Sequence, residues 1–163
     1  MKASMEKALN IQLALEFESA YAYLGMAAYF ESVDYGGFSH WMKAQSQEEL
    51  NHFHRIFKFI GECGGTIILP DIKKPKTSFN TILDVFKTSL KQEQKVTQSI
   101  HTIYDKALKE KAFASFNFLN WFIEEQVEEE AEVTRLIKEL ERIESNKSAL
   151  LLLDRELGKR GSP

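Results

Sequence analysis

Cysteine is nearly absent from this sequence, since Cys63 is the only one among 163 residues. A single thiol excludes a disulfide bond within one chain. It also excludes a zinc or iron–sulfur site built from several cysteines of that chain. The scarcity of cysteine fits a reducing compartment, where thiols stay reduced.

Long apolar segments are also absent. No apolar run exceeds five residues, the length of Ala149–Leu153, which is far short of the roughly 18 apolar residues of a membrane-spanning helix. The first residues, Met1–Lys7, lack the apolar run of a signal peptide. The net charge of −3 indicates no basic face for nucleic acid. We therefore expect a cytoplasmic protein that binds neither a membrane nor a nucleic acid.

Proline is rare, and its positions leave most of the chain free to form helices. Only Pro70, Pro75 and Pro163 occur, and a proline in a helix interior removes a backbone hydrogen bond. We expect five helices, at about residues 5–32, 38–62, 79–109, 113–145 and 147–158. The third helix is expected to be capped by Ser78 or Asn80, since these residue types favour helix N-termini.

The connections between the helices predict their topology. The first and second helices, and the third and fourth, are joined by short turns, which makes each pair antiparallel. The segment 66–78 is longer, and its residues span roughly 43–47 Å when extended, whereas the second helix is roughly 38 Å long. The sequence therefore predicts one all-α domain over residues 1–163, a four-helix bundle with one long crossover and a short fifth helix.

Each of the four long helices has an apolar seam, which we define as the positions reached by alternating steps of four and three residues. Near its middle each seam is interrupted by a carboxylate: Glu16, Glu49, Glu93 or Glu129. A buried carboxylate without a partner is costly. No lysine or arginine occupies a seam position. We therefore expect the neutralising charge to come from metal ions.

A metal centre at this layer has six candidate residues. Glu49 and His52 are three apart and share one helix face, although Glu-x-x-His alone is also common on solvated helices. The six are Glu16, Glu49, His52, Glu93, Gln126 and Glu129. Four carboxylates balance two divalent ions, and oxygen-rich ligation with a single imidazole suits iron better than structural zinc.

The ligands divide between the two expected ions by their positions. Glu49 is expected to bridge the ions, with Glu16 and His52 completing one of them. Glu93 and Glu129 complete the other, and Gln126 is a neutral neighbour.

Other residues near the seams have two readings each. Glu48, Glu125 and Glu128 lie one position from seam residues and, with Glu129, could hold a third ion, or they form a solvated acidic face. Tyr23 lies two turns after Glu16 and either reaches a ligand carboxylate or is a core residue with a satisfied hydroxyl. Trp121 either supplies an electron or packs in the core.

Four segments of the chain match a known family. They are LEFESAYAY at 15–23, QEELNH at 47–52, EQ at 93–94 and NFLNWFIEEQVEEE at 117–130, and they resemble the non-haem ferritins of bacteria and archaea. The resemblance implies iron storage by a ferroxidase, in which O2 or peroxide oxidises Fe(II) and ferric mineral collects inside a hollow shell. It also implies a homo-oligomer of twenty-four subunits, with the run 149–153 buried around four-fold axes.

The resemblance also assigns roles by position. It implies that Glu16, Glu49, His52, Glu93 and Glu129 are di-iron ligands, with Gln126 adjacent. It implies a third iron site at Glu48, Glu125, Glu128 and Glu129. Bacterioferritins carry Glu-x-x-His on both the second and the fourth helix, whereas the fourth helix here reads Gln-x-x-Glu at residues 126–129. Their haem-binding methionine would fall at Leu50 of this sequence. We therefore expect no haem.

Two rival functions fit the sequence less well. A di-iron peroxidase or oxidase of the rubrerythrin kind usually carries a cysteine-rich module, which a single cysteine excludes. A purely structural or signalling bundle would not explain a carboxylate in all four seams.

Overall fold

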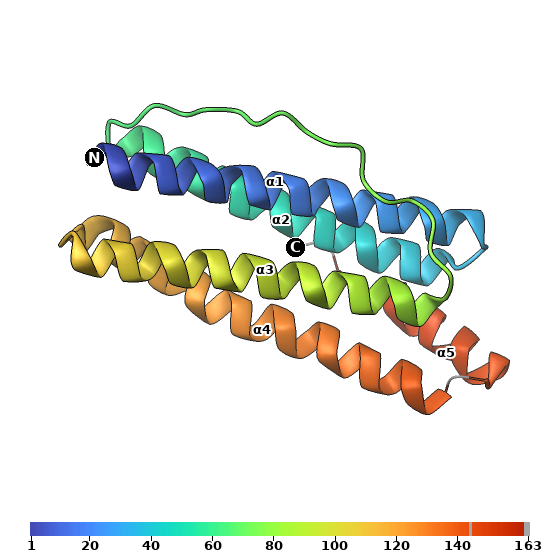
Figure 1. The fold of residues 1–163 in the computed structure, drawn as a ribbon. Coiled ribbons are helices and arrows are strands. Elements are labelled where there is room, and N and C mark those ends of the chain that lie inside the picture. The colour runs from blue at the N-terminus through green and yellow to red at the C-terminus, as the bar shows by residue number, and fades with distance from the viewer. Residues whose placement is uncertain (144, 162–163) are drawn as a thin grey trace.

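The chain forms five helices and no strand over residues 1–143 and 145–161, the part that this computed structural model describes. They are α1 (Ala3–Ser32), α2 (Gly36–Glu62), α3 (Ile82–Lys109), α4 (Phe113–Ile143) and α5 (Lys147–Leu157). The predicted all-α class is confirmed (Figure 1). None of these helices combines the length and apolar character that crossing a bilayer requires.

The four long helices lie side by side with the predicted topology. Figure 1 shows α1 antiparallel to α2, α3 antiparallel to α4, and the crossover running the length of the bundle beside α1. Asn10 of α1 fastens the start of this crossover, because its side chain donates to Thr66 O at 2.9 Å and accepts from Ile68 N at 2.7 Å. The crossover makes α2 and α3 parallel.

The helix boundaries differ from the expected ones at several ends. The third helix begins at Ile82 rather than Phe79, and its cap is Thr81, whose hydroxyl accepts a hydrogen bond from Asp84 N at 3.0 Å. The expected cap at Ser78 or Asn80 was wrong because Phe79 is drawn into the core, where its ring packs 5.3 Å from that of Tyr29. The expected end of the fourth helix at residue 145 runs through residue 144, which lies outside the described residues.

The apolar core is divided into two clusters along the bundle. One cluster lies around Phe30, Phe38, Phe86 and Leu136, and the other around Leu9, Ile56, Ile100 and Phe122. The seam carboxylates fall between them in sequence on all four helices. The two clusters supply the hydrophobic stabilisation, and the layer between them is left for polar groups.

The docking of α5 on α2 depends on Gly37. Phe38 N donates to Asp154 Oδ1 at 2.9 Å, and a Cβ added at Gly37 would lie 1.6 Å from Asp154 O. We expect Gly37→Ala to push α5 away and to cost about 1–3 kcal/mol, the usual range for overpacking. The melting temperature of the purified protein measures this loss. Gly36→Ala is the control, because nothing lies within 4 Å of an added Cβ there, and equal melting temperatures for the two variants would contradict the contact.

Candidate metal centre

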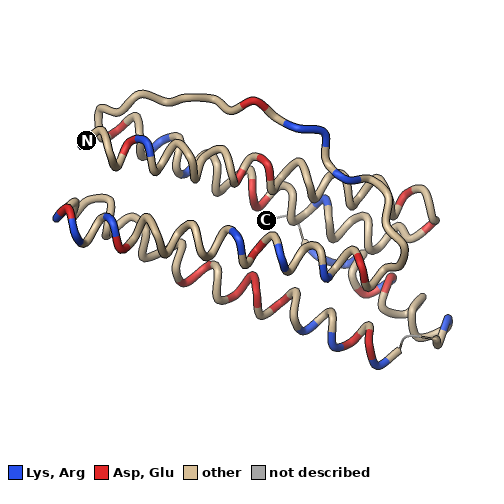
Figure 2. Tube along the Cα trace, viewed as in Figure 1, with Lys and Arg blue, Asp and Glu red and all other residues tan. Residues whose placement is uncertain are grey.

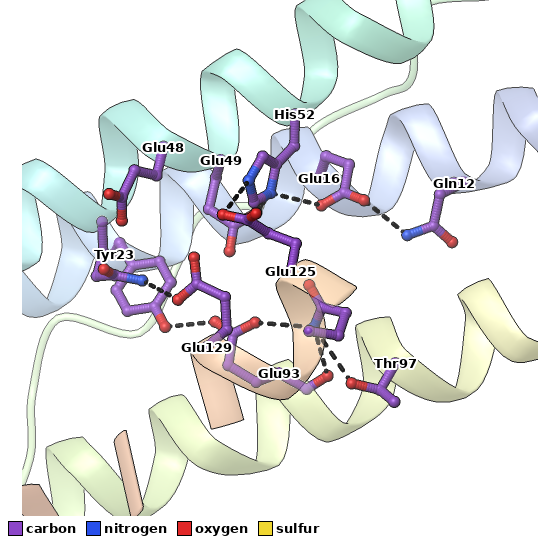
Figure 3. A network of polar contacts seen from close by, with 12 residues as sticks. Gln12, Glu16, Tyr23, Glu48, Glu49, His52, Glu93, Thr97, Glu125 and Glu129 are labelled. Atoms are coloured by element: carbon purple, nitrogen blue, oxygen red, sulfur yellow. Dashed lines mark hydrogen bonds and ion pairs between the residues drawn. The ribbon is translucent and has the colours of Figure 1, made fainter. Parts of the chain in front are cut away.

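Helices α1 and α2 bring three buried side chains together at the middle of the bundle. Ligand atoms of Glu16, Glu49 and His52 all lie within 4.8 Å of one another. His52 Nδ1 lies 3.3 Å from Glu49 Oε2 and 3.9 Å from Glu16 Oε2. In Figure 3 the three side chains project from the two helices towards the space between the four. All three residues are among the six that the seam spacing places at one layer.

The atoms that face one another in this cluster have no hydrogen-bond partner. They are Glu16 Oε2, both carboxylate oxygens of Glu49, and His52 Nδ1, all of them buried. Buried polar atoms are nearly always hydrogen-bonded, and each exception is costly. Four such atoms at one place, three of them carboxylate oxygens, fit a divalent cation.

Helices α3 and α4 supply the opposite side of the centre. The Tyr23 hydroxyl donates to Glu93 Oε1 and lies 2.8 Å from Ser89 Oγ. Gln126 Nε2 lies 3.4 Å from the other oxygen, Glu93 Oε2, and 3.2 Å from Thr97 Oγ1. Each oxygen of the Glu93 carboxylate therefore has a contact, one with Tyr23 and a longer one with Gln126.

Two buried glutamines were not among the residues expected at the centre. Gln45 Nε2 donates to Glu129 Oε2 at 2.7 Å, and Gln12 Nε2 donates to Glu16 Oε1 at 2.8 Å. Each glutamine lies one helical turn before a seam carboxylate, Gln45 before Glu49 and Gln12 before Glu16. A glutamine four residues before a seam carboxylate is therefore a signal that could have identified Gln12 and its partner Glu16, whereas it does not reveal that Gln45 reaches Glu129 on another helix. Their amides orient the carboxylates without adding charge.

Burial makes the carboxyl groups of this layer hard to ionise. Desolvation raises the pKa of Glu16 and of Glu93. It also raises the pKa of Glu49 well above its usual value, and repulsion from the nearby Glu93 carboxylate raises the pKa of Glu49 further. Desolvation likewise raises the pKa of Glu129 to about 8. Charged groups in low dielectric need a compensating charge. Without a cation the centre therefore retains protons that a bound metal ion would displace.

The imidazole of His52 is surrounded by carboxylates. Burial disfavours its charged form, but contacts with Glu125, Glu49 and Glu16 outweigh that effect and raise the pKa of His52 to about 11. Its ring also packs edge-on against Trp121, with centroids 5.3 Å apart. The Arg55 guanidinium lies over the Trp121 ring, with its carbon 4.1 Å from the ring centroid. Trp121 thus packs directly on the histidine.

The residues expected at a third ion are only partly gathered. Ligand atoms of His52, Glu125 and Glu129 lie within 4.8 Å of one another, and His52 Nε2 is 3.9 Å from Glu125 Oε1. Glu48 instead pairs with Arg160 Nη2 at 2.6 Å. Glu128 is exposed and belongs to none of the possible metal-binding groups in the described residues. Figure 2 shows that acidic residues nevertheless recur along α4 beside this layer.

Comparisons with known proteins agree on one family. The model of the ferritin-like domain matches residues 6–143. The bacterial non-heme ferritin of Staphylococcus aureus (strain MRSA252) is 39% identical over 160 residues, which are 98% of this chain and 96% of that protein. The bacterial non-heme ferritin of Staphylococcus epidermidis is 41% identical over 153 residues, 94% of this chain and 92% of that one.

Solved structures agree with the sequence relatives. The open pore ferritin from the hyperthermophilic archaeon Archaeoglobus fulgidus superposes with a TM-score of 0.98 at 42% identity and covers 99% of each chain. Fold and sequence thus match over nearly the whole length, including the crossover and α5. The chain belongs to the ferritin family, and the iron-storage function that its sequence resemblance implied is confirmed at the level of that family.

Proposed function

We propose that the chain is a ferroxidase, which oxidises Fe(II) at the centre between the four long helices. The observation that carries this proposal is the group of four buried, unpartnered ligand atoms on Glu16, Glu49 and His52. Iron enters as the substrate. Each pair of Fe(II) ions releases two electrons, the number that reduces O2 to hydrogen peroxide or hydrogen peroxide to water.

The proposed ligands form two halves joined by one carboxylate. Glu16 and His52 hold one ion, Glu93 and Glu129 hold the other, and Glu49 contacts both. The hydrogen bond from the Tyr23 hydroxyl keeps Glu93 in place for this role, and Gln126 adds only a long contact of 3.4 Å. Because ligating carboxylates must be ionised, the protons that burial keeps on this layer leave as the ions bind. Iron binding is therefore expected to release protons.

A third ion is proposed on the α4 side of the centre. Glu125 and Glu129 already lie beside His52, and Glu48 and Glu128 complete the set once their side chains turn towards them. No haem is proposed, because the side chain of Leu50 offers no ligand to iron. The family resemblance also supports a cytoplasmic location.

The chain is proposed to form a hollow shell of twenty-four copies. Leu151 and Leu152 on α5 are 51% and 65% exposed in the single chain, and burying such apolar surface favours assembly. Twenty-four chains of 18.8 kDa give a particle of about 450 kDa.

The size of the purified protein tests the shell directly. We expect size-exclusion chromatography with light scattering to give a mass near that of twenty-four chains. Leu152→Asp should shift the protein to smaller species, because it places a charge in the proposed contact. A wild-type protein that elutes as a monomer or dimer would contradict storage inside a shell.

A further inference from the structure

The chain segment after α5 places Arg160 beside acidic residues of α2 and α4. Arg160 Nη2 lies 2.6 Å from Glu48 Oε2 and 3.8 Å from Glu132 Oε2. The guanidinium carbon lies 4.9 Å from the centre of the Trp41 ring, and Trp41 Nε1 donates to Glu132 Oε1 at 3.3 Å. One positive charge is therefore held between two carboxylates and an aromatic face.

The backbone around Arg160 is fixed as well. His40 Nε2 lies 2.8 Å from the carbonyl oxygen of Arg160. Leu153 and Leu157 of α5 are buried in the core, and Asp154 accepts from Phe38 N. The docking of α5 on α2 thus delivers the arginine to Glu48, which is 112 residues away in sequence.

The guanidinium is nevertheless incompletely satisfied in this position. Its Nη1 atom is buried and has no hydrogen-bond partner. A buried donor without an acceptor costs free energy, and this cost offsets part of the stabilisation that the guanidinium gains from Glu48. Such an arginine can be displaced by a competing cation.

We propose that Arg160 is a tethered counter-ion, which occupies Glu48 and competes with the third metal ion for that carboxylate. The inference rests on the third ion site of the proposed function. A guanidinium and a divalent ion repel each other when both contact one carboxylate, so the ion must displace Arg160 before Glu48 completes its coordination. Arg160 thereby makes the third site the weakest of the three, and an ion that binds there is released readily.

An anaerobic titration with Fe(II) alone tests the competition in the assembled protein. We expect Arg160→Gln to bind the third ion about two- to fivefold more tightly, the range set by losing one partly exposed ion pair, and to bind the first two ions as the wild type does. Arg155→Gln is the matched control, because Arg155 is exposed on α5 and makes no ion pair within the described residues. It should leave all three affinities unchanged.

A double variant shows whether the effect acts through Glu48. Glu48→Gln should weaken the third ion, and adding Arg160→Gln to it should bring no gain, since the carboxylate under competition is gone. An unchanged or weaker third ion in Arg160→Gln alone would overturn the inference. If two ions bind but no third ion appears in any variant, the third site and this inference both fall. Absence of all three ions would refute the proposed function as well.

Discussion

Replacing Glu49 or His52 with alanine should lower the rate of Fe(II) oxidation by about a hundredfold or more, as expected for a ligand that holds reacting metal ions. Both carboxylate oxygens of Glu49 are buried without a hydrogen-bond partner, and His52 is the one histidine in the candidate metal-binding groups of the described residues. Stopped-flow absorbance of Fe(III), at two Fe(II) per chain in air-saturated buffer, measures this rate.

Gln126→Ala is the control for this experiment. The Gln126 amide is uncharged and reaches Glu93 Oε2 only at 3.4 Å, so its loss should leave most of the oxidation rate. The melting temperatures of all three variants show whether the bundle still folds. Wild-type oxidation rates in both Glu49→Ala and His52→Ala would show that the site is assigned to the wrong residues.

The metal-free protein should become more stable when one of its buried carboxylates is neutralised. Glu129→Gln removes a charge from a position that is 6% exposed, while its side-chain oxygen can still accept from Gln45. We expect a gain of about 1–3 kcal/mol at pH 8 or above, in the range that follows replacement of buried charge by neutral groups. The same variant should bind iron more weakly, because a ligand is lost.

The pH dependence follows from the pKa of Glu129, which burial raises from 4.5 to about 8. A carboxyl with a raised pKa in the folded chain binds its proton more tightly there than in the unfolded chain. Its contribution to stability is therefore present below pH 4.5 and is lost as the pH rises towards 8. The advantage of Glu129→Gln should be small near pH 4.5 and largest at pH 8 and above.

Thermal melting of both proteins in the presence of a chelator, at several pH values, measures this difference. Glu124→Gln on the same helix is the control, because Glu124 is exposed and the substitution makes the same change in charge. A difference between Glu129→Gln and the wild type that stays constant from pH 4.5 to pH 8 would contradict the assignment of the raised pKa to Glu129.

Most of the fold, and the burial of the candidate ligands, could be predicted because both depend on short-range spacing. Helical periodicity places Glu16, Glu49, Glu93 and Glu129 in four seams, and the structure confirms that all four are buried. Crossover length is a matter of counting residues, and the parallel arrangement of α2 and α3 is confirmed. Helical periodicity was therefore enough to predict the burial of residues whose environment depends on their position on one helix.

The features that sequence reasoning missed depend on contacts between distant segments. The spacing of the acidic residues suggested that Glu48 is available to a metal ion, and nothing near it in sequence indicated Arg160 as its partner. Similarly, Thr81 became the cap of α3 because tertiary packing buries Phe79. The pairing of Gln45 with Glu129 joins α2 to α4 across the bundle. Spacing along a single helix carries no information about such pairs.

Crystals soaked anaerobically in Fe(II) and measured at the iron absorption edge would locate the ions that the five proposed ligands bind. We expect two anomalous peaks per chain between the four long helices. One peak should contact Glu16 and His52, the other Glu93 and Glu129, and Glu49 should contact both. Iron bound only at exposed acidic residues, with no peak or a single peak among these five side chains, would contradict this expectation.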